Sequence, residues 1–498
     1  MSKFSERLAQ IVHEKKLVQK HLSARIMIDN ADFSRMLKGL RRPTEEQFER
    51  LCSVMSLPAA VRQELEDYLE EDRIGQAAYE QHDMVRRMIG SIESLEPDTL
   101  RDSGCSRKMI ISENPSEQKI IICSSAYAVD NAVKDIVEMA AYSGKNEQLR
   151  IFCSFKYKNL FSLIYQILCS MPGCMSVKHL LSMESLSESS GKNNTMRMME
   201  ILPFALSVGS GYSAYYYFTQ NIEANDAARM YPYYIVSGDR VLRISSDFET
   251  GVLLCDADHA DLYRDNFDMV LGLSEPVVTQ YGSMEDTLSG EQEHITYDNC
   301  DIHYIVSEPA LCRVLNPDVI LSCRKKDISE PESIDKIANL ARVRFSQLYA
   351  MDMLSTGLIF SVAGLDKFME TGRSSELPEC ITDPFPISVR LQYLEKYIEL
   401  INKGGFIRAA NPAKLRVSRG CSMLIAANKS IIVNTHDKDM TDFRSAHIFE
   451  ESVLNAFKAF LEYIHNPRSK MVLSREETLG ILTAWVERLR ERQRAGEK

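Results

Sequence analysis

The sequence lacks the motifs that mark several common enzyme classes. It contains no GxxxxGK[ST] loop, no GxGxxG after a strand, no GxSxG and no HExxH. These are the usual markers of nucleotide hydrolysis, dinucleotide chemistry, serine hydrolysis and zinc proteolysis. The twelve cysteines form no CxxC pair, and no secretory leader is evident in residues 1–14. We therefore expect no catalytic site, no metal and no cofactor, and reduced thiols in a cytoplasmic protein.

Long hydrophobic runs are also scarce. Residues 201–218 are uncharged, but this stretch contains Pro203, Gly209 and Gly211. A helix that spans a bilayer needs about 20 mainly apolar residues, so we interpret the stretch as a buried core segment and expect no membrane partner. At 498 residues and 45% hydrophobic content, the chain is long enough for several cores. It is predicted to be a multidomain globular protein.

The first 70 residues show the apolar spacing of short packed helices. Helical repeats of apolar residues occur in three places: Phe4, Leu8, Ile11 and Val12; Phe33, Met36 and Leu37; and Phe48, Leu51, Cys52 and Met55. Asp29 is a good N-cap residue, Gly39 is typical of a helix end, and Thr44 with Gln47 has the spacing of a capping box. A fifth helix is expected from Pro58 to about Leu69.

Residues 17–43, LVQKHLSARIMIDNADFSRMLKGLRRP, resemble the Cro and lambda-repressor-like (XRE) helix-turn-helix family. The matching positions are Gln19, Leu22, Ser23, Ile28, Asp29, Phe33, Ser34, Gly39 and Pro43. Met27 stands where the family has a turn glycine, and Leu37 replaces the usual glutamate. The resemblance covers about the first 70 residues and implies an all-α helix-turn-helix domain in residues 1–73 whose third helix enters the major groove of double-stranded DNA.

The resemblance also implies which side chains would contact DNA. Base-reading candidates on the third helix are Asn30, Ser34 and Arg35, since asparagine pairs well with adenine and arginine with guanine. Phosphate contacts are expected from Gln19, Lys38, Arg41 and Arg42. Asp32 is unfavourable beside phosphates unless it accepts a hydrogen bond from a cytosine amine.

Charge is distributed unevenly along the chain. The whole protein has a formal net charge of −11, but residues 1–43 hold ten basic and four acidic residues, a balance of +6. Residues 44–73 hold nine acidic and three basic residues, a balance of −6. A locally basic module suits DNA, because phosphate contacts supply much of the affinity. The alternative is that these basic residues only solvate a helical bundle that binds protein.

The rest of the chain has the alternating pattern of an α/β (α+β) body. We expect a connector at 74–116, one α/β lobe at 117–290, a second at 291–470 and a C-terminal helix at 471–498. Three strands and a helix are predicted at 233–267 and again at 423–461, so the lobes are either related copies or a coincidental match. Polar segments 182–195 and 282–293 are predicted surface loops. The C-terminal helix, which contains the only tryptophan, Trp485, either packs on the body or helps two chains associate.

Two polar clusters have the residue types of functional sites, the first those of a metal site and the second those of a catalytic site. Asp256, Asp258, His259 and Asp261 precede or begin a helix, where acidic residues favour the helix dipole, and we interpret them as capping residues. His436, Lys438 and Asp442 come close to the HxKxxxxD motif of phospholipase D-like enzymes. The aspartate is one residue early and the first lobe has no matching motif, so we predict a degenerate, non-catalytic relative of that plan.

Together these features predict a sequence-specific DNA-binding transcriptional regulator that is not an enzyme. One reader of this size contacts few bases, so a homodimer is expected. The body would sense an unidentified small-molecule or protein effector, or mediate assembly. The rival interpretations are an enzyme or defence effector that its helix-turn-helix localises to nucleic acid, and a protein-interaction scaffold.

Overall fold

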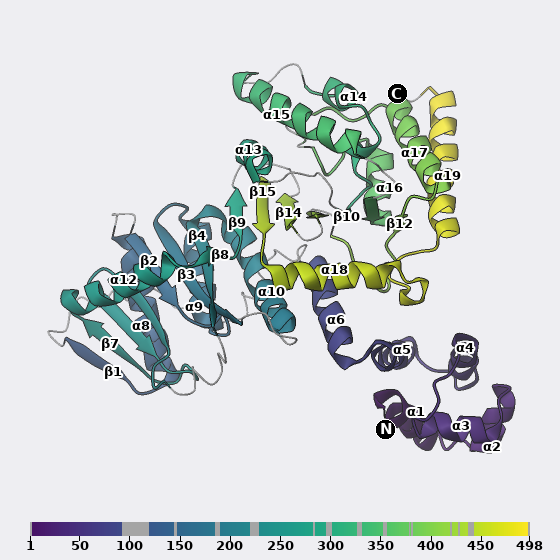
Figure 1. Ribbon diagram of the computed structural model, residues 1–498, viewed down its shortest axis with the longest axis horizontal. Coiled ribbons are helices and arrows are strands. Elements are labelled where there is room, and N and C mark those ends of the chain that lie inside the picture. Colours follow the sequence, from purple (N-terminus) through teal and green to yellow (C-terminus); the bar gives the residue numbers. More distant parts are fainter. Residues whose placement is uncertain are drawn as a thin grey trace. The chain divides into compact units, whose positions relative to one another are not determined.

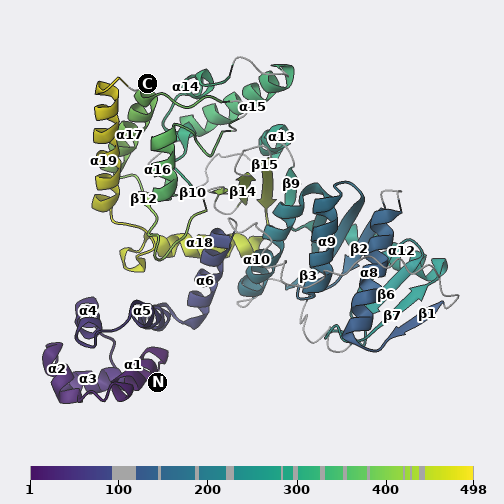
Figure 2. The same ribbon diagram turned by 180° about the vertical axis from the view of Figure 1, so that it is seen from behind.

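The computed structural model describes residues 2–91, 119–143, 147–184, 190–219, 229–281, 284–294, 301–325, 331–351, 356–377, 379, 382–418, 421–426, 429–436 and 443–496. Residue contacts divide the chain into two compact units, Met1–Asp83 and Met84–Lys498. The first is helical and the second is mixed α/β (Figures 1 and 2), which confirms the multidomain prediction at this level. Within the described ranges, no helix has the length and hydropathy needed to cross a membrane.

The N-terminal unit is built from short helices. They are α1 (Lys3–Glu14), α2 (Gln19–Arg25), α3 (Asn30–Leu37), α4 (Glu45–Val54) and α5 (Ala59–Ile74), and α6 (Gln76–Ser91) continues into the second unit. The Asp29 carboxylate accepts the Ala31 N–H at 3.0 Å at the start of α3. Thr44 and Gln47 form both bonds of a capping box on α4. Both predicted helix starts are therefore confirmed.

Four of these helices end with the same turn. The residue after the C-cap has a positive φ in each case: Lys16 (53°), Met27 (59°), Gly39 (73°) and Ser56 (45°). The next amide then donates to a carbonyl five residues back, as from Ile28 to Ser23 at 3.0 Å. This is the Schellman motif, which satisfies carbonyls left open at a helix end. A left-handed backbone costs a non-glycine residue about 1–2 kcal/mol, so glycine is best suited to the position.

Replacing Met27 by glycine should stabilise the N-terminal unit. The Met27 side chain is 74% exposed, so little packing offsets the cost of its left-handed backbone. We expect Met27→Gly to slow amide hydrogen exchange in α1–α5 of the full-length protein by roughly threefold to fivefold, equivalent to about 1 kcal/mol.

Gly39 supplies the matched control. Its φ is positive and an added Cβ would lie 3.0 Å from Ser5 Oγ, so Gly39→Ala should speed exchange. Equal or faster exchange in Met27→Gly would contradict the strain argument.

The second unit contains an eight-stranded sheet. Its order is β1-β7-β6-β5-β2-β3-β4-β8. The strands are β1 (Ile120–Cys123), β2 (Glu147–Phe152), β3 (Met175–Glu184), β4 (Tyr212–Thr219), β5 (Tyr233–Ser237), β6 (Arg240–Ile244), β7 (Gly251–Cys255) and β8 (Glu275–Pro276). The pairs β2–β3 and β3–β4 are parallel and the others are antiparallel.

A seven-stranded sheet follows in the chain. Its order is β12-β11-β10-β13-β14-β15-β9. The strands are β9 (Thr279–Tyr281), β10 (Ile302–Val306), β11 (Thr356–Phe360), β12 (Ile407–Ala409), β13 (Cys421–Ala426), β14 (Ser430–His436) and β15 (Phe443–Ile448). The pairs β10–β11 and β11–β12 are parallel and the others are antiparallel.

Seven strands of the first sheet have the same order and directions as the seven of the second. The order β1-β7-β6-β5-β2-β3-β4 corresponds strand by strand to β9-β15-β14-β13-β10-β11-β12. In both sheets, an antiparallel meander joins a parallel trio, and the strand that closes the meander edge comes first in the chain. The two predicted strand-strand-strand-helix runs are both present.

Helices cover the sheets. The helices of the first sheet are α8 (Ala126–Tyr142), α9 (Lys158–Ser170), α10 (Ser190–Val208) and α12 (Ala257–Leu271). Those of the second are α13 (Met284–His294), α14 (Pro317–Ser322), α15 (Pro331–Ala350), α16 (Val362–Thr371), α17 (Ile387–Asn402), α18 (Glu451–His465) and α19 (Arg475–Arg494). Ala260 of α12 packs on Val236 and Val241, while Val129 of α8 approaches Leu242 and Gly251 on the opposite face.

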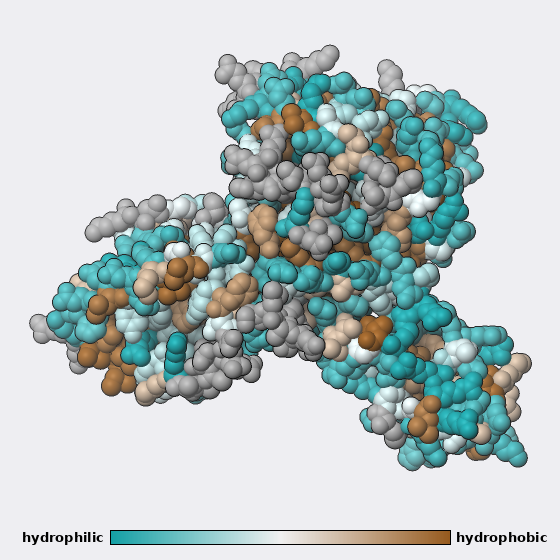
Figure 3. Space-filling model, viewed as in Figure 1, coloured by the Kyte–Doolittle hydropathy of each residue, from teal (hydrophilic) through white to brown (hydrophobic). Residues whose placement is uncertain are grey.

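Hydrophobic side chains remain exposed at the meander edge of the first sheet. Ile120 and Ile122 of the edge strand β1 are 60% and 74% exposed, and brown atoms gather where β1 and β7 lie (Figure 3). Edge strands of monomeric proteins usually carry charge or proline instead, because an apolar edge is a template for pairing. Among the described residues, no further strand pairs with this edge.

Two features join the sheets. The buried Asn194 side chain of α10 donates to Ser452 Oγ at 2.9 Å and to Glu450 Oε1 at 3.4 Å, at the start of α18. It also exchanges hydrogen bonds with the main chain of Glu184, the last residue of β3. In addition, β8 and β9 are separated only by the buried residues Val277 and Val278, so one short segment gives an edge strand to each sheet.

The loop predictions for 182–195 and 282–293 are wrong over most of their described residues. Residues 182–184 end β3, residues 190–195 begin α10, and residues 284–293 lie in α13. Asn194 and Thr195 are fully buried, because Asn194 finds polar partners more than 250 residues away. Local polarity cannot reveal such a partner. The segment 201–218 spans the end of α10 and most of β4, with Ile201, Leu202 and Tyr212 fully buried, as predicted for a core segment.

The C-terminal helix α19 packs on the body. Ser474 and Glu477 form its predicted capping box. Leu482 and Leu489 are fully buried in the core of the second sheet's helices, and Trp485 Nε1 donates to Asp366 at 2.7 Å. The first of the two roles expected for this helix is therefore the one observed. Residues 92–118, most of the predicted connector, lie outside the described residues.

Removing the Asn194 side chain should destabilise the body. Asn194→Ala removes the four hydrogen bonds that the Asn194 side chain makes with Ser452, Glu450 and the Glu184 main chain, which costs about 2–4 kcal/mol. We expect a lower unfolding midpoint in denaturant titrations of the full-length protein.

The adjacent Asn193 is the matched control. It is only partly buried, and within the described ranges its side chain makes one hydrogen bond, to Glu184 Oε2 at 2.7 Å. Asn193→Ala should cost less than about 1 kcal/mol. Equal shifts for the two variants would show that the joint does not depend on the Asn194 amide.

Candidate nucleic-acid interface

The third helix of the N-terminal unit buries one face and exposes the other. Phe33 and Met36 are fully buried, whereas Asn30 is exposed, Ser34 is partly exposed and the Arg35 side chain is 64% exposed. The spacing of the apolar residues causes this division, since residues three and four apart share a helix face. The three base-reading candidates are therefore on the solvent side of one helix.

Asp32 pairs with two of the predicted DNA contacts. Its Oδ1 lies 3.4 Å from Arg35 Nη1, and its Oδ2 forms an ion pair with Arg41. The acid that is unfavourable beside phosphates thus has a role in the free protein, because it holds two guanidinium groups at the C-terminal side of α3. Its pairing with Arg41 depends on the bend at Gly39, which sequence spacing alone does not specify.

A surface hollow brings three further candidates together. It is lined by Gln19 at the start of α2, by Ser34 of α3 and Lys38 directly after it, and by His13 of α1 and Lys16 just beyond its end. Apolar residues complete the lining: Ala9, Val12, Leu17 and Leu37. His13 and Lys16 were not among the predicted site residues. The sequence gives little indication of their role, because they simply come after the buried apolar residues of α1 and belong to no motif. The hollow combines amide, hydroxyl, imidazole and ammonium groups, which are all able to bind an anion.

The basic patch is smaller than the residue count indicates. Lys3 pairs with Glu71 at 2.6 Å and Arg7 with Glu64 at 3.0 Å, which ties α1 to the acidic helix α5. Lys15 Nζ donates to the Met55 carbonyl at 2.8 Å, at the end of α4. Within the described ranges, six cations of residues 1–43 have no ion pair: Lys15, Lys16, Lys20, Arg25, Lys38 and Arg42. Of the predicted phosphate contacts, Lys38 and Arg42 keep their charge uncompensated.

The acidic cluster before α12 is a helix cap, as predicted. Asp256 Oδ2 accepts the His259 N–H at 3.4 Å and lies 2.7 Å from His259 Nδ1. The hydrogen bond from His259, with a second from Lys119, lowers the Asp256 pKa to about 2. The described residues contain no group of three potential ligands that could hold a metal. Lys438 and Asp442 lie outside the described residues, and the His436 side chain is likewise not described.

Comparisons with known proteins give little further information. No family model matches the chain, and no curated protein matches it. Among solved structures, it is similar to the archaeal chromatin protein TrmBL2, whose structure is described as showing a novel mode of DNA binding. The identity is 13%, the match covers 55% of this chain and 100% of that one, and the TM-score is 0.24. This degree of likeness does not define a shared fold.

Proposed function

We propose that this protein is a sequence-specific DNA-binding transcriptional regulator whose N-terminal unit is an XRE-type helix-turn-helix domain. The observation that carries the proposal is the division of α3, with Phe33 and Met36 buried and Asn30, Ser34 and Arg35 turned to solvent. The left-handed backbone of Met27, where the family has a turn glycine, supports the same assignment. In this interpretation α2 and α3 form the motif and α3 enters the major groove.

The contacts divide by chemistry. Asn30, Ser34 and Arg35 read base edges, while Gln19, Lys38, Arg41 and Arg42 hold phosphates. Arg35 and Arg41 must leave Asp32 to do so. The hollow between α1 and α3 is a place for one phosphate group beside Gln19 and Lys38. The protein is not an enzyme in this proposal.

The proposed active form is a homodimer with two related lobes in each body. The shared seven-strand order of the two sheets supports an internal duplication. The small size of the reader supports dimerisation, because two readers double the number of bases contacted. The exposed apolar edge at Ile120 and Ile122 is a surface suited to pairing. The body senses an effector and alters DNA binding by favouring one spacing of the readers.

Loss of the base-reading side chains tests the proposal. We expect Arg35→Ala and Asn30→Ala each to weaken binding to a DNA site selected from a random pool by roughly fivefold to a hundredfold, since a bidentate contact contributes about 1–3 kcal/mol. Fluorescence anisotropy at fixed salt measures this.

Arg50→Ala is the matched control, because Arg50 lies on α4 and pairs with Glu46. Unchanged affinity in both α3 variants, with the fold intact, would overturn the assignment.

Neutralising Asp32 should strengthen DNA binding. Asp32→Asn frees Arg35 and Arg41 and removes a negative charge from the face proposed to meet phosphates. We expect non-specific affinity to rise severalfold, and the slope of log K against log salt to become more negative by about 1.

Glu46→Gln makes the same change in net charge but acts at an acid on α4 that pairs with Arg50. If Glu46→Gln increases affinity as much as Asp32→Asn, the effect is due to net charge and not to the α3 ion pairs.

A further inference from the structure

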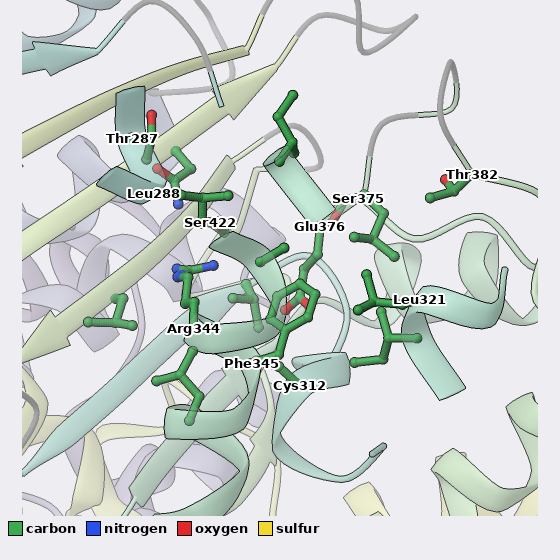
Figure 4. Close-up of a pocket in the computed structure, with 18 of the residues that line it drawn as sticks. Thr287, Leu288, Cys312, Leu321, Arg344, Phe345, Ser375, Glu376, Thr382 and Ser422 are labelled. Carbon is green, nitrogen blue, oxygen red and sulfur yellow. The ribbon is translucent and has the colours of Figure 1, made fainter. Parts of the chain in front are cut away.

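The second sheet and its helices enclose a cavity of about 100 Å³. Its wall is formed by residues of β10, β13 and β14, by α13, α14 and α15, and by the segment after α16. Figure 4 shows Arg344 and Phe345 from α15, Cys312, Glu376 and Ser422 around the space. These residues come from four separate parts of the chain and meet only in the folded body.

Most of the wall is apolar. Leu288, Ile320, Ala341 and Leu348 belong to the buried core and also line the cavity. The volume is of the same order as that of an engineered apolar cavity of ~150 Å³ that binds benzene. A ligand that enters without rearrangement therefore has a compact hydrophobic body of roughly one small ring.

One side of the cavity is polar. Ser422, Asn434 and Ser445 are paired across β13, β14 and β15, so they share one face of the sheet, and the first two line the cavity. In the described part of the protein, Asn434 Oδ1 and Ser445 Oγ are buried and have no hydrogen-bond partner. A buried polar atom left unsatisfied costs about 1–3 kcal/mol. This cost is offset if a ligand supplies a donor to Asn434.

Two ionisable groups complete the wall. Glu376 Oε2 accepts the Leu311 N–H at 3.0 Å, and burial, together with the nearby Glu308, raises the Glu376 pKa to about 8. The raised pKa favours the protonated carboxyl group, which has an O–H to donate. Arg344, on α15, places guanidinium N–H donors at the same cavity. The cavity thus offers both an acceptor and donors around an apolar space.

We propose that this cavity is a binding site for a small, largely apolar molecule with a hydroxyl head group, of the class of simple phenols and compact alcohols. A hydroxyl donates one hydrogen bond and accepts others, which matches an unpartnered Asn434 oxygen beside donors on Arg344 and Glu376. A carboxylate head cannot donate to Asn434. A hydrocarbon leaves the polar row unsatisfied.

The test compares phenol with toluene, which have nearly the same shape. Transfer from water into a purely apolar cavity favours toluene, because phenol must give up hydrogen bonds to water. We expect the full-length protein to bind phenol at least tenfold more tightly than toluene in ligand-observed NMR titrations, and Asn434→Leu to remove that preference.

Two further variants locate the binding. Ala341→Leu adds bulk to the cavity wall and should abolish binding of both probes. Asn402→Leu, which changes an exposed asparagine at the end of α17, should leave both affinities unchanged.

Four results would overturn the proposal. They are no phenol binding up to its solubility limit, equal binding of phenol and toluene to the wild-type protein, a full phenol preference in Asn434→Leu, and full phenol binding in Ala341→Leu. The binding itself does not rest on the proposed DNA-binding function. Only the role of the cavity as an effector site rests on that function. Measuring DNA affinity with and without phenol tests this role. If the protein binds phenol but not DNA, the proposed regulator function is wrong and the proposed binding site stands.

Discussion

The body of this protein depends on one buried amide. Asn194 connects the last residue of β3 to the N-terminus of α18, and each of its polar atoms has a partner. Buried polar groups are usually hydrogen-bonded, so the position of β3 relative to α18 that satisfies the amide is favoured. The short segment from β8 to β9 acts in the same direction, because its two strands belong to different sheets. The Asn194 hydrogen bonds and the β8–β9 segment together link the two sheets.

Local features of the fold were predictable from the sequence. Asp29, Thr44 and Ser474 cap helices as expected, because a cap depends only on residues two or three positions away. The strands of both meanders were also predictable, because their sequence signals are local. By contrast, the predicted loops are wrong at α13 and at the start of α10, where Asn194 is buried against Ser452 and Glu450, more than 250 positions away. Strand order is similarly non-local, and no spacing in the sequence indicates that β9 pairs with β15.

The two candidate sites, the α3 face and the cavity, also differ in how far the sequence predicts them. Asn30, Ser34 and Arg35 lie on one helix, so helical periodicity places them on the exposed face. The ion pairs of Asp32 were not predicted, because the pair with Arg41 needs the bend after α3. The cavity beside the second sheet could not be predicted from the sequence. Its residues Tyr304, Arg344, Glu376 and Asn434 span some 130 positions and share no motif. Sequence reasoning thus found the part of the site that one helix carries.

The strand order has a consequence for the time course of synthesis. In each sheet the strand that closes the meander edge is made before all the others, and β9 pairs with a partner 164 residues further on, Tyr281 with Ser445. Translation adds about 5–20 residues per second, so β9 waits roughly 10–30 s for its partner strand. The first sheet can close during that interval, because β7 is complete at Cys255, before β9 begins. The ribosome therefore delivers one finished sheet and, directly attached to it, the opening strand of the next.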